Sequence, residues 1–161
     1  MKTHTRPAPL LLAFAVALAA CAGRAPVSDP VSDPVPPSRP VRVDDLVGSE
    51  WIAEDIAGAT IAGGSRSTLH FLSIAQVDGD TGCNRFAGPV TLEDGNLRIG
   101  PLATTRRACA PALMDQERRY LVAIAQGVAL RRDGDLLILL DDRQRPLVRY
   151  SQVDPHVPTR P

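Results

Sequence analysis

The sequence of 161 residues has few aromatic residues, few cysteines and no excess of charge of one sign. Basic and acidic residues number 18 each, so the chain lacks the strong positive field that attracts nucleic acid. The longest apolar run, residues 10–20, is shorter than the about 20 residues that a membrane-spanning helix needs. A chain of this length suits one domain with tails and excludes a large multidomain enzyme.

The first twenty residues have the pattern of a secretory signal peptide. Lys2 and Arg6 provide a positive start, and residues 10–18 form a short apolar core. Two alanines, small residues typical of a cleavage site, then precede Cys21. We therefore expect residues 1–20 to direct export and to be removed from the mature protein.

Residues 18–21, Leu-Ala-Ala-Cys, resemble the bacterial lipobox, in which the cysteine receives a diacylglycerol and becomes the mature N-terminus. Several acyl chains such as palmitate, each contributing about 0.8 kcal/mol per buried CH₂, make such an anchor permanent. Ala22 directly after the cysteine implies, by the same resemblance, an outer-membrane lipoprotein whose domain faces the periplasm or the cell surface. Ordinary cleavage after Ala22 is the alternative, because small residues also flank Cys21.

Residues 21–43 are expected to form a proline-rich tether. Residues 22–40 contain six prolines and a repeated Val-Ser-Asp-Pro. Proline without apolar periodicity cannot form a packed core, so this segment is a semi-extended spacer. The tail, residues 154–161, is similarly structureless, which leaves residues 44–153 for one domain. A motif that recruits a proline-binding partner is the alternative interpretation of the tether.

The three cysteines support export. An odd number is unusual in an exported protein unless one thiol is otherwise engaged, and lipidation of Cys21 leaves Cys83 and Cys109. Oxidising compartments favour a disulfide between these two, which would stabilise the fold by about 3–4 kcal/mol. A catalytic thiol is the alternative, but no sequence signature accompanies it. Two cysteines and one histidine in the domain are too few for zinc, so we expect no metal and no cofactor.

The hydrophobic pattern of the domain predicts antiparallel strands with one helix. Strands are predicted over residues 51–56, 68–75, 76–79 (a short edge strand), 90–92, 97–99, 128–132, 135–140 and 146–153. Residues 81–89 are predicted to form a glycine-bounded loop, and Asp94-Gly95 a hairpin turn. Residues 111–126 have helical spacing, with Pro111 in the first turn and Gly127 at the end. The fold class is therefore α+β.

Two motifs resemble those of the META domain family, the HslJ type of heat-shock protein. Residues 82–88 match its GCN-x-F-x-G segment and residues 105–109 its T-x-x-x-C segment, and the resemblance extends over residues 46–152. It implies a cracked, open antiparallel barrel interrupted by one helix. The family as a whole has no established active site. Some relatives are lipoproteins associated with envelope stress or antibiotic tolerance, and related folds include pilotin lipoproteins of type III secretion.

The matching residues have structural explanations. The residues singled out are Trp51, Gly82, Asn84, Phe86, Gly88, Thr105 and Glu117. We expect Gly82 and Gly88 to adopt backbone conformations that side chains forbid. Asn84 is expected to bond nearby main chain, and Thr105 to satisfy a buried strand end.

Glu117 lies on the apolar stripe of the predicted helix, near Tyr120 and Ile124. A buried carboxylate needs a hydrogen-bonding partner or a raised pKa. The structural hypothesis is that it bonds loop amides around residues 82–84 or pairs with Arg85, Arg106 or Arg107. The functional hypothesis, a catalytic acid or base, needs a second group and a pocket. His70, the only histidine of the domain, has no partner that the sequence identifies and is expected to be a surface residue of a strand.

These observations predict a non-enzymatic, lipid-anchored protein of the cell envelope that acts through binding and supports stress or antibiotic tolerance. Its expected partners are the membrane, through the N-terminal lipid, and an envelope protein. The alternatives are a pilotin-like assembly chaperone that holds an acyl chain or amphipathic segment, and an enzyme that uses Glu117. An inhibitor or adhesin that presents its loops is a further alternative.

Overall fold

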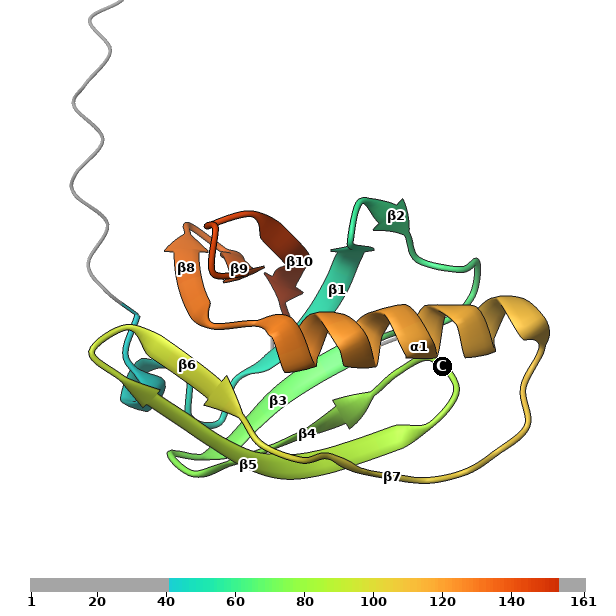
Figure 1. Ribbon diagram of the computed structural model, residues 1–161, viewed down its shortest axis with the longest axis horizontal. Helices are drawn as coiled ribbons and strands as arrows, with labels where there is room; N and C mark the ends of the chain where they lie inside the picture. The colour runs from blue at the N-terminus through green and yellow to red at the C-terminus, as the bar shows by residue number, and fades with distance from the viewer. Residues whose placement is uncertain (1–40, 154–161) are drawn as a thin grey trace, which may run out of the picture. The chain divides into compact units, whose positions relative to one another are not determined.

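The computed structural model describes residues 41–153, which form ten strands, one α-helix and a short 3-10 helix (Figure 1). The strands are β1 (Glu50–Ile56), β2 (Ala59–Thr60), β3 (Thr68–Ser73), β4 (Gln76–Asp80), β5 (Arg85–Glu93), β6 (Asn96–Ile99), β7 (Ala103–Thr104), β8 (Ala129–Asp133), β9 (Leu136–Leu140) and β10 (Pro146–Gln152). The helices are η1 (Val43–Asp45) and α1 (Pro111–Gln126). The predicted signal peptide, Cys21, most of the tether and the tail lie outside the described residues.

The strands form one antiparallel sheet in the order β6-β5-β4-β3-β1-β10-β9-β8, with β2 beside β1 and β7 beside β5. The two outer strands curve toward each other, and Leu97 of β6 donates a backbone hydrogen bond to Val128 O, just before β8, at 2.8 Å. Helix α1 lies between the β3–β4–β5 side and the β1–β10–β9–β8 side of the curved sheet (Figure 1). The predicted α+β class, an open antiparallel barrel with one helix, is confirmed.

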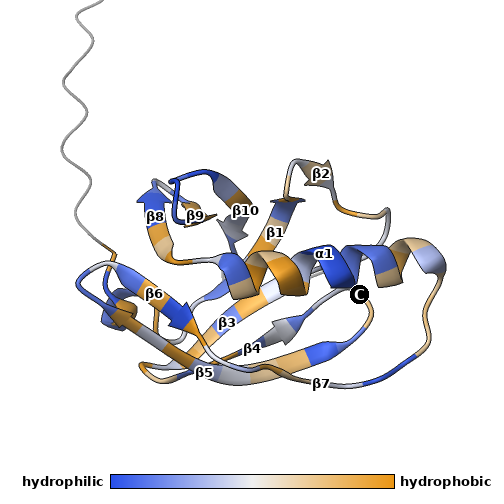
Figure 2. Ribbon diagram, viewed as in Figure 1, coloured by the Kyte–Doolittle hydropathy of each residue, from blue (hydrophilic) through white to orange (hydrophobic). Residues whose placement is uncertain are grey.

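The interior of the barrel is filled by large side chains. Alternate residues of each strand point inward, as Leu69 and Phe71 do on β3. Tyr120 and Ile124 of α1 meet them from the helix. Figure 2 shows hydrophilic residues in the middle of α1 and mostly hydrophobic residues toward its C-terminal end. Within residues 41–153, no helix is long and apolar enough to span a bilayer.

Several boundaries differ from the prediction. Residues 85–89 were expected in a loop but belong to β5, because they pair with β4 along Gln76–Asp80. For the same reason β4 is not an edge strand: it lies between β3 and β5. The two-residue strands β2 and β7 have no hydrophobic period and were not predicted. Val41, which was placed in the tether, is buried and belongs to the hydrophobic core (8% exposed).

The residues predicted to begin and end the helix and to form the hairpin turn occupy these places in the structure. Pro111 begins α1, and Gly127 follows its last residue as the C-cap. Gly127 has an extended backbone with a φ of −67°, which any residue can adopt. Glycine is favoured there because a Cβ would clash with the side chain of Leu139. Asp94 and Gly95 have φ values of 50° and 82°, as a tight turn between β5 and β6 requires.

Gly79 of β4 lies where two neighbouring strands leave no room for a side chain. A Cβ at this position would lie 2.1 Å from the backbone oxygen of Thr68 and 2.7 Å from the ring of Phe86. Backbone cannot move aside as a flexible side chain does. The contact therefore constrains this position to glycine.

We expect Gly79→Ala to lower the free energy of unfolding by about 2 kcal/mol or more, because the added methyl overpacks the sheet. Guanidinium unfolding monitored by the fluorescence of Trp51, the only tryptophan, measures this. Gly63→Ala is the control, since nothing lies within 4 Å of its Cβ position. Equal effects of the two substitutions would contradict the packing argument.

Asp141 holds the turn between β9 and β10. Its Oδ1 accepts hydrogen bonds from the backbone N–H groups of Arg143 and Arg145 at 2.9 and 2.8 Å. Its Oδ2 accepts one from Nε of Arg145 at 2.8 Å. The backbone hydrogen bond of Arg145, followed by its side chain and the N–H of Arg143, lowers the pKa of the Asp141 carboxyl. The ionised form therefore stabilises the fold.

Asp141→Asn should be less stable than the wild type at neutral pH. A lowered pKa means that this stabilisation is present above the unfolded-state pKa and is lost as pH falls through the folded-state pKa. The difference between the two proteins should therefore shrink as the pH drops below about 4. Thermal melts from pH 7 to pH 2 measure it, with exposed Asp142→Asn as control. A difference that is constant with pH would exclude the charge as its cause.

Candidate functional site

The motif residues come together where the first half of α1 crosses the turn between β4 and β5. Glu117 Oε2 accepts hydrogen bonds from the hydroxyl of Thr81 at 2.6 Å and from the side-chain amide of Asn84 at 2.9 Å. The backbone N–H of Asn84 donates in turn to the Thr81 hydroxyl at 2.9 Å. Thr81, Asn84 and Glu117, called the inner tie below, therefore fasten the helix to the turn.

Asn84 extends the inner tie to the segment before the helix. Its Oδ1 accepts the backbone N–H of Arg107 at 2.7 Å and the hydroxyl of Thr105 at 2.9 Å. Its Nδ2 also donates to Arg107 O at 3.3 Å. The expected bonding of Asn84 to main chain is present, and one side chain thus joins the turn, the helix and residues 105–107.

A disulfide covers the same place. Cys83 and Cys109 are joined with an S–S length of 2.10 Å and a Cα–Cα distance of 6.0 Å. Cys83 is buried and lies in the turn, whereas Cys109 lies two residues before α1. The bond holds the approach to the helix against the turn that the inner tie also contacts.

The partners of Glu117 differ from those expected. Loop amides or the side chain of Arg85, Arg106 or Arg107 were expected, yet the carboxylate accepts hydrogen bonds from a hydroxyl and a side-chain amide. Within residues 41–153, no arginine forms an ion pair with it. All three arginines are exposed: Arg85 begins β5, and Arg106 and Arg107 lie between β7 and α1.

Gln116 is the most buried polar residue of the helix, and the sequence analysis missed it. Its Oε1 accepts the backbone N–H of Ala62 at 2.6 Å, and its Nε2 donates to the hydroxyls of Ser65 and Ser67 at 3.0 and 3.1 Å. On a helical projection at about 100° per residue, Gln116 lies between two buried residues, Tyr120 and Ala123. A polar residue on this buried side of the helix is the feature of the sequence that indicates its role.

Glycine is required at the two motif positions, 82 and 88, for different reasons. Gly82 has a φ of 93°, as expected for a left-handed position, and a Cβ there would lie 2.5 Å from Gln116 Nε2. Gly88 lies within β5 without a positive φ, so the expectation of a special conformation was wrong. A Cβ at Gly88 would meet Leu102 at 2.7 Å and Pro101 O at 2.9 Å, which makes close packing the reason.

Thr105 differs from its expected role in one respect. It bonds the end of a strand, since its hydroxyl accepts the backbone N–H of Arg85 at 3.1 Å and its own N–H donates to Arg85 O at 3.0 Å. Both residues are exposed, however, so the strand end is not buried. The contact positions the start of β5 at the surface.

Trp51 and Phe86 belong to the core. Trp51 is fully buried, and its Nε1 donates to the hydroxyl of Ser49 at 2.7 Å. The ring of Phe86 lies edge-on to Tyr120, with centroids 6.0 Å apart. Tyr120 donates its hydroxyl to Thr68 O at 3.0 Å, and burial, followed by the nearby Tyr150, raises the pKa of Tyr120 well above its usual value. These residues pack the barrel and face no pocket.

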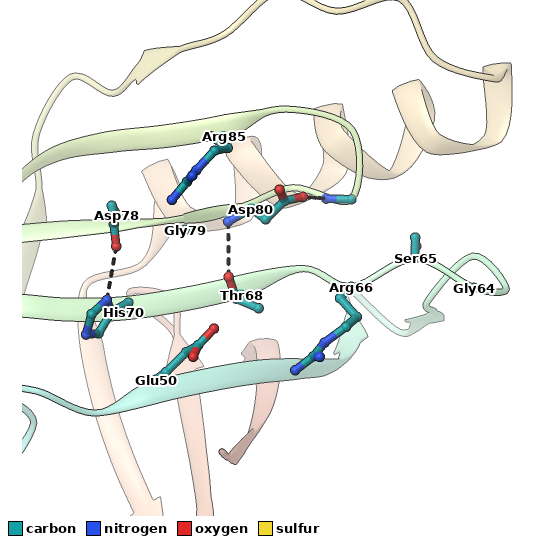
Figure 3. Close-up of a pocket in the computed structure, with 11 residues that line it drawn as sticks. Glu50, Gly64, Ser65, Arg66, Thr68, His70, Asp78, Gly79, Asp80 and Arg85 are labelled. Carbon is teal, nitrogen blue, oxygen red and sulfur yellow. Dashed lines mark hydrogen bonds and ion pairs between the residues drawn. The ribbon is translucent and has the colours of Figure 1, made fainter. Parts of the chain in front are cut away.

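A groove of about 660 Å³ lies on the opposite face of the sheet, over β1, β3, β4 and β5 (Figure 3). Its charged lining residues are Glu50, Arg66, His70, Asp78, Asp80 and Arg85. His70 Nδ1 lies 3.3 Å from Asp78 Oδ1, a partner that the sequence analysis did not identify because strand register brings the two together. We call this surface the outer groove. Its walls are polar and half-buried to exposed.

The inner tie and the outer groove are separate. Glu117 does not line the groove, and its Oε2 is engaged by Thr81 and Asn84. Within residues 41–153, no cluster of three His, Cys, Asp or Glu side chains could hold a metal ion. The inner tie is therefore a structural element, and the outer groove is the candidate binding site.

The fold and the inner tie define a small open barrel whose helix is held by a polar turn and a disulfide. The family model of the META domain matches residues 44–154, and the chain belongs to this family. No match was found among the curated proteins.

Solved structures show the same fold. The NMR structure of a protein from Burkholderia xenovorans is 25% identical, covering 81% of this chain and 97% of its own, with a TM-score of 0.58. A second NMR structure is 24% identical over 69% of this chain and 94% of its own, with a TM-score of 0.57. The crystal structure of a DUF4847 family protein from Bacteroides vulgatus is 9% identical, covering 67% and 94%, with a TM-score of 0.50.

We expect Glu117→Gln to lower the free energy of unfolding by about 1 kcal/mol, and Glu117→Ala by about 2 kcal/mol. The amide weakens two charge-assisted hydrogen bonds, whereas alanine leaves Thr81 and Asn84 without this acceptor. Denaturant unfolding with the disulfide intact measures both. The control is Glu93→Gln, an exposed carboxylate of the β5–β6 hairpin. Unchanged stability in both Glu117 variants would mean that the inner tie does not hold the helix.

Proposed function

We propose that this META domain protein is a lipid-anchored component of the cell envelope that acts by binding and not by catalysis, and that it supports stress or antibiotic tolerance. Cys21 would carry the lipid and the outer membrane would hold the anchor. Residues 22–40 would act as the spacer between the bilayer and the domain.

The pairing of the thiols is the observation that supports this proposal most strongly. Cys83 and Cys109 are joined to each other, and Cys21 is the third cysteine of the sequence. It follows directly on a signal-like segment at the lipobox position. Disulfides persist in oxidising compartments, which is consistent with export of the domain.

The filled barrel argues for a surface-binding role over the pilotin-like alternative. A protein that holds an acyl chain in its barrel needs an apolar cavity there, yet Trp51, Phe71 and Tyr120 fill this interior. The enzyme alternative needs a cleft at Glu117, whose Oε2 is engaged by the inner tie. The outer groove has the size of a ligand site, and charged side chains from several strands line it.

The anchor can be tested by mass spectrometry of the N-terminal peptide. For the wild type we expect an N-terminus at Cys21 that carries diacylglycerol and a third acyl chain, with the protein in the outer-membrane fraction. Cys21→Ser should lose both the adduct and this location. A mature N-terminus at Gly23 without lipid would overturn the anchor and support ordinary cleavage after Ala22.

A matched variant separates lipidation from folding. The double substitution Cys83→Ser/Cys109→Ser should keep the lipid on Cys21 and the outer-membrane location, while it unfolds at a lower denaturant concentration. Crosslinking in intact envelopes, with wild type and Cys21→Ser compared, then tests binding. Proteins captured by the wild type alone would support a role at the membrane, and capture of none would count against an envelope partner.

A further inference from the structure

The outer groove contains charges that the surrounding strands leave without a partner. Strand register places Glu50, His70 and Asp78 side by side on three neighbouring strands, β1, β3 and β4. His70 has a carboxylate on either side. Its Nδ1 lies 3.3 Å from Asp78 Oδ1, and Figure 3 shows the ring directed to Asp78. Glu50 is thereby left unpaired at the edge of the groove.

Two further oppositely charged residues lie opposite each other on β4 and β5 but form no ion pair. Asp80 of β4 and Arg85 of β5 are register partners, a placement that ordinarily favours an ion pair. Asp80 Oδ1 instead accepts the backbone N–H of Gly82 at 2.7 Å, which turns the carboxylate toward the β4–β5 turn (Figure 3). The guanidinium of Arg85 therefore remains free and points along the groove over Gly79.

Arg66 provides the third free charge, from the loop before β3. Within residues 41–153, neither Arg66, Arg85 nor Glu50 has a side-chain hydrogen bond or an ion pair. Thr68, which accepts the Asp80 N–H at 3.1 Å, lies between the two arginines on the floor. The groove thus presents two unpaired cations and one unpaired anion around a polar floor.

We propose that the outer groove binds a small zwitterion with a phosphoryl group and a primary ammonium, as in phosphoethanolamine. Arg66 and Arg85 would hold the phosphoryl oxygens from two sides, and Glu50 would accept the ammonium. Two planar guanidinium forks match the several oxygens of a phosphoryl group, whereas one fork satisfies a carboxylate. The ammonium is required because Glu50, Asp78 and Asp80 would repel an anion without a compensating positive charge.

The proposed site goes beyond the anchor and does not depend on it. The same chemistry occurs in a free phosphate monoester and in the phosphodiester headgroup of phosphatidylethanolamine. A lipid-anchored protein would meet the headgroup at high local concentration. Soluble probes distinguish the two sources without a membrane, and they test the groove whether or not Cys21 is acylated.

The test is calorimetric titration of the full-length protein, in detergent and with its disulfide intact, with phosphoethanolamine. We expect saturable binding at one site, weaker binding of phosphocholine, whose ammonium has no N–H to donate, and weaker binding of inorganic phosphate or ethanolamine alone. Binding of glycerophosphoethanolamine identifies the lipid headgroup as the source. Binding of the monoester alone identifies a free phosphate ester.

Three substitutions assign the contacts. Arg66→Gln and Arg85→Gln should each weaken phosphoethanolamine about tenfold or more, since each removes charged donors. Glu50→Gln should weaken phosphoethanolamine but leave inorganic phosphate equal or stronger, because it removes both the ammonium acceptor and a repulsive charge. Arg131→Gln, an equal change of charge on exposed β8, is the control and should have no effect.

The proposal is overturned if no saturable binding of phosphoethanolamine occurs, or if Arg131→Gln weakens it as much as Arg85→Gln does. It is also overturned if Glu50→Gln weakens phosphoethanolamine and inorganic phosphate equally, because the ammonium would then not be recognised. None of these results bears on the lipid at Cys21. Conversely, an unlipidated Cys21 leaves the binding results unaffected, so the two proposals fail independently.

Discussion

The attachment of α1 to the turn between β4 and β5 is the constraint on which the rest of the domain depends. The strand order does not close into a ring: β6 and β8 are its two ends, and Leu97 of β6 donates a backbone hydrogen bond to Val128 O, just before β8. The helix must therefore fill the barrel, and its position is set by the inner tie, by Gln116 and by the disulfide before its first turn. These directional polar contacts thus fix the position of the helix against the sheet, which non-directional apolar packing alone would specify less strictly.

Local chemistry made much of the fold predictable from the sequence. Helix α1, from Pro111 to Gln126, has a period of 3.6 residues and a proline at its start, and the Asp94-Gly95 turn needs residues that accept positive φ. The start of β5 was not predictable in this way. Its residues 85–89 include a glycine and a proline, which locally resemble a loop, and only pairing with β4 makes them a strand. Tertiary pairing overrode local propensity there.

The two sites differ in how much of them the sequence revealed. Glu117 was conspicuous because a carboxylate near Tyr120 and Ile124 conflicts with burial, although its partners proved to be neutral side chains and not arginines. The outer groove gave no such signal. Apart from Arg66, which lies in the loop before β3, its charged residues are outward residues of separate strands. Their neighbours follow from strand register, which no local pattern specifies.

One turn serves both faces of the sheet. On the inside, the space beside Gly82 is occupied by Gln116, and Thr81 belongs to the inner tie. On the outside, the N–H of Gly82 takes the carboxylate of Asp80 away from Arg85. Since a β-strand sends alternate side chains to opposite faces, the turn that fixes the helix also leaves a cation free in the groove. The strong structural role of the motif and a binding role for the opposite surface are therefore compatible: the first makes the second rigid.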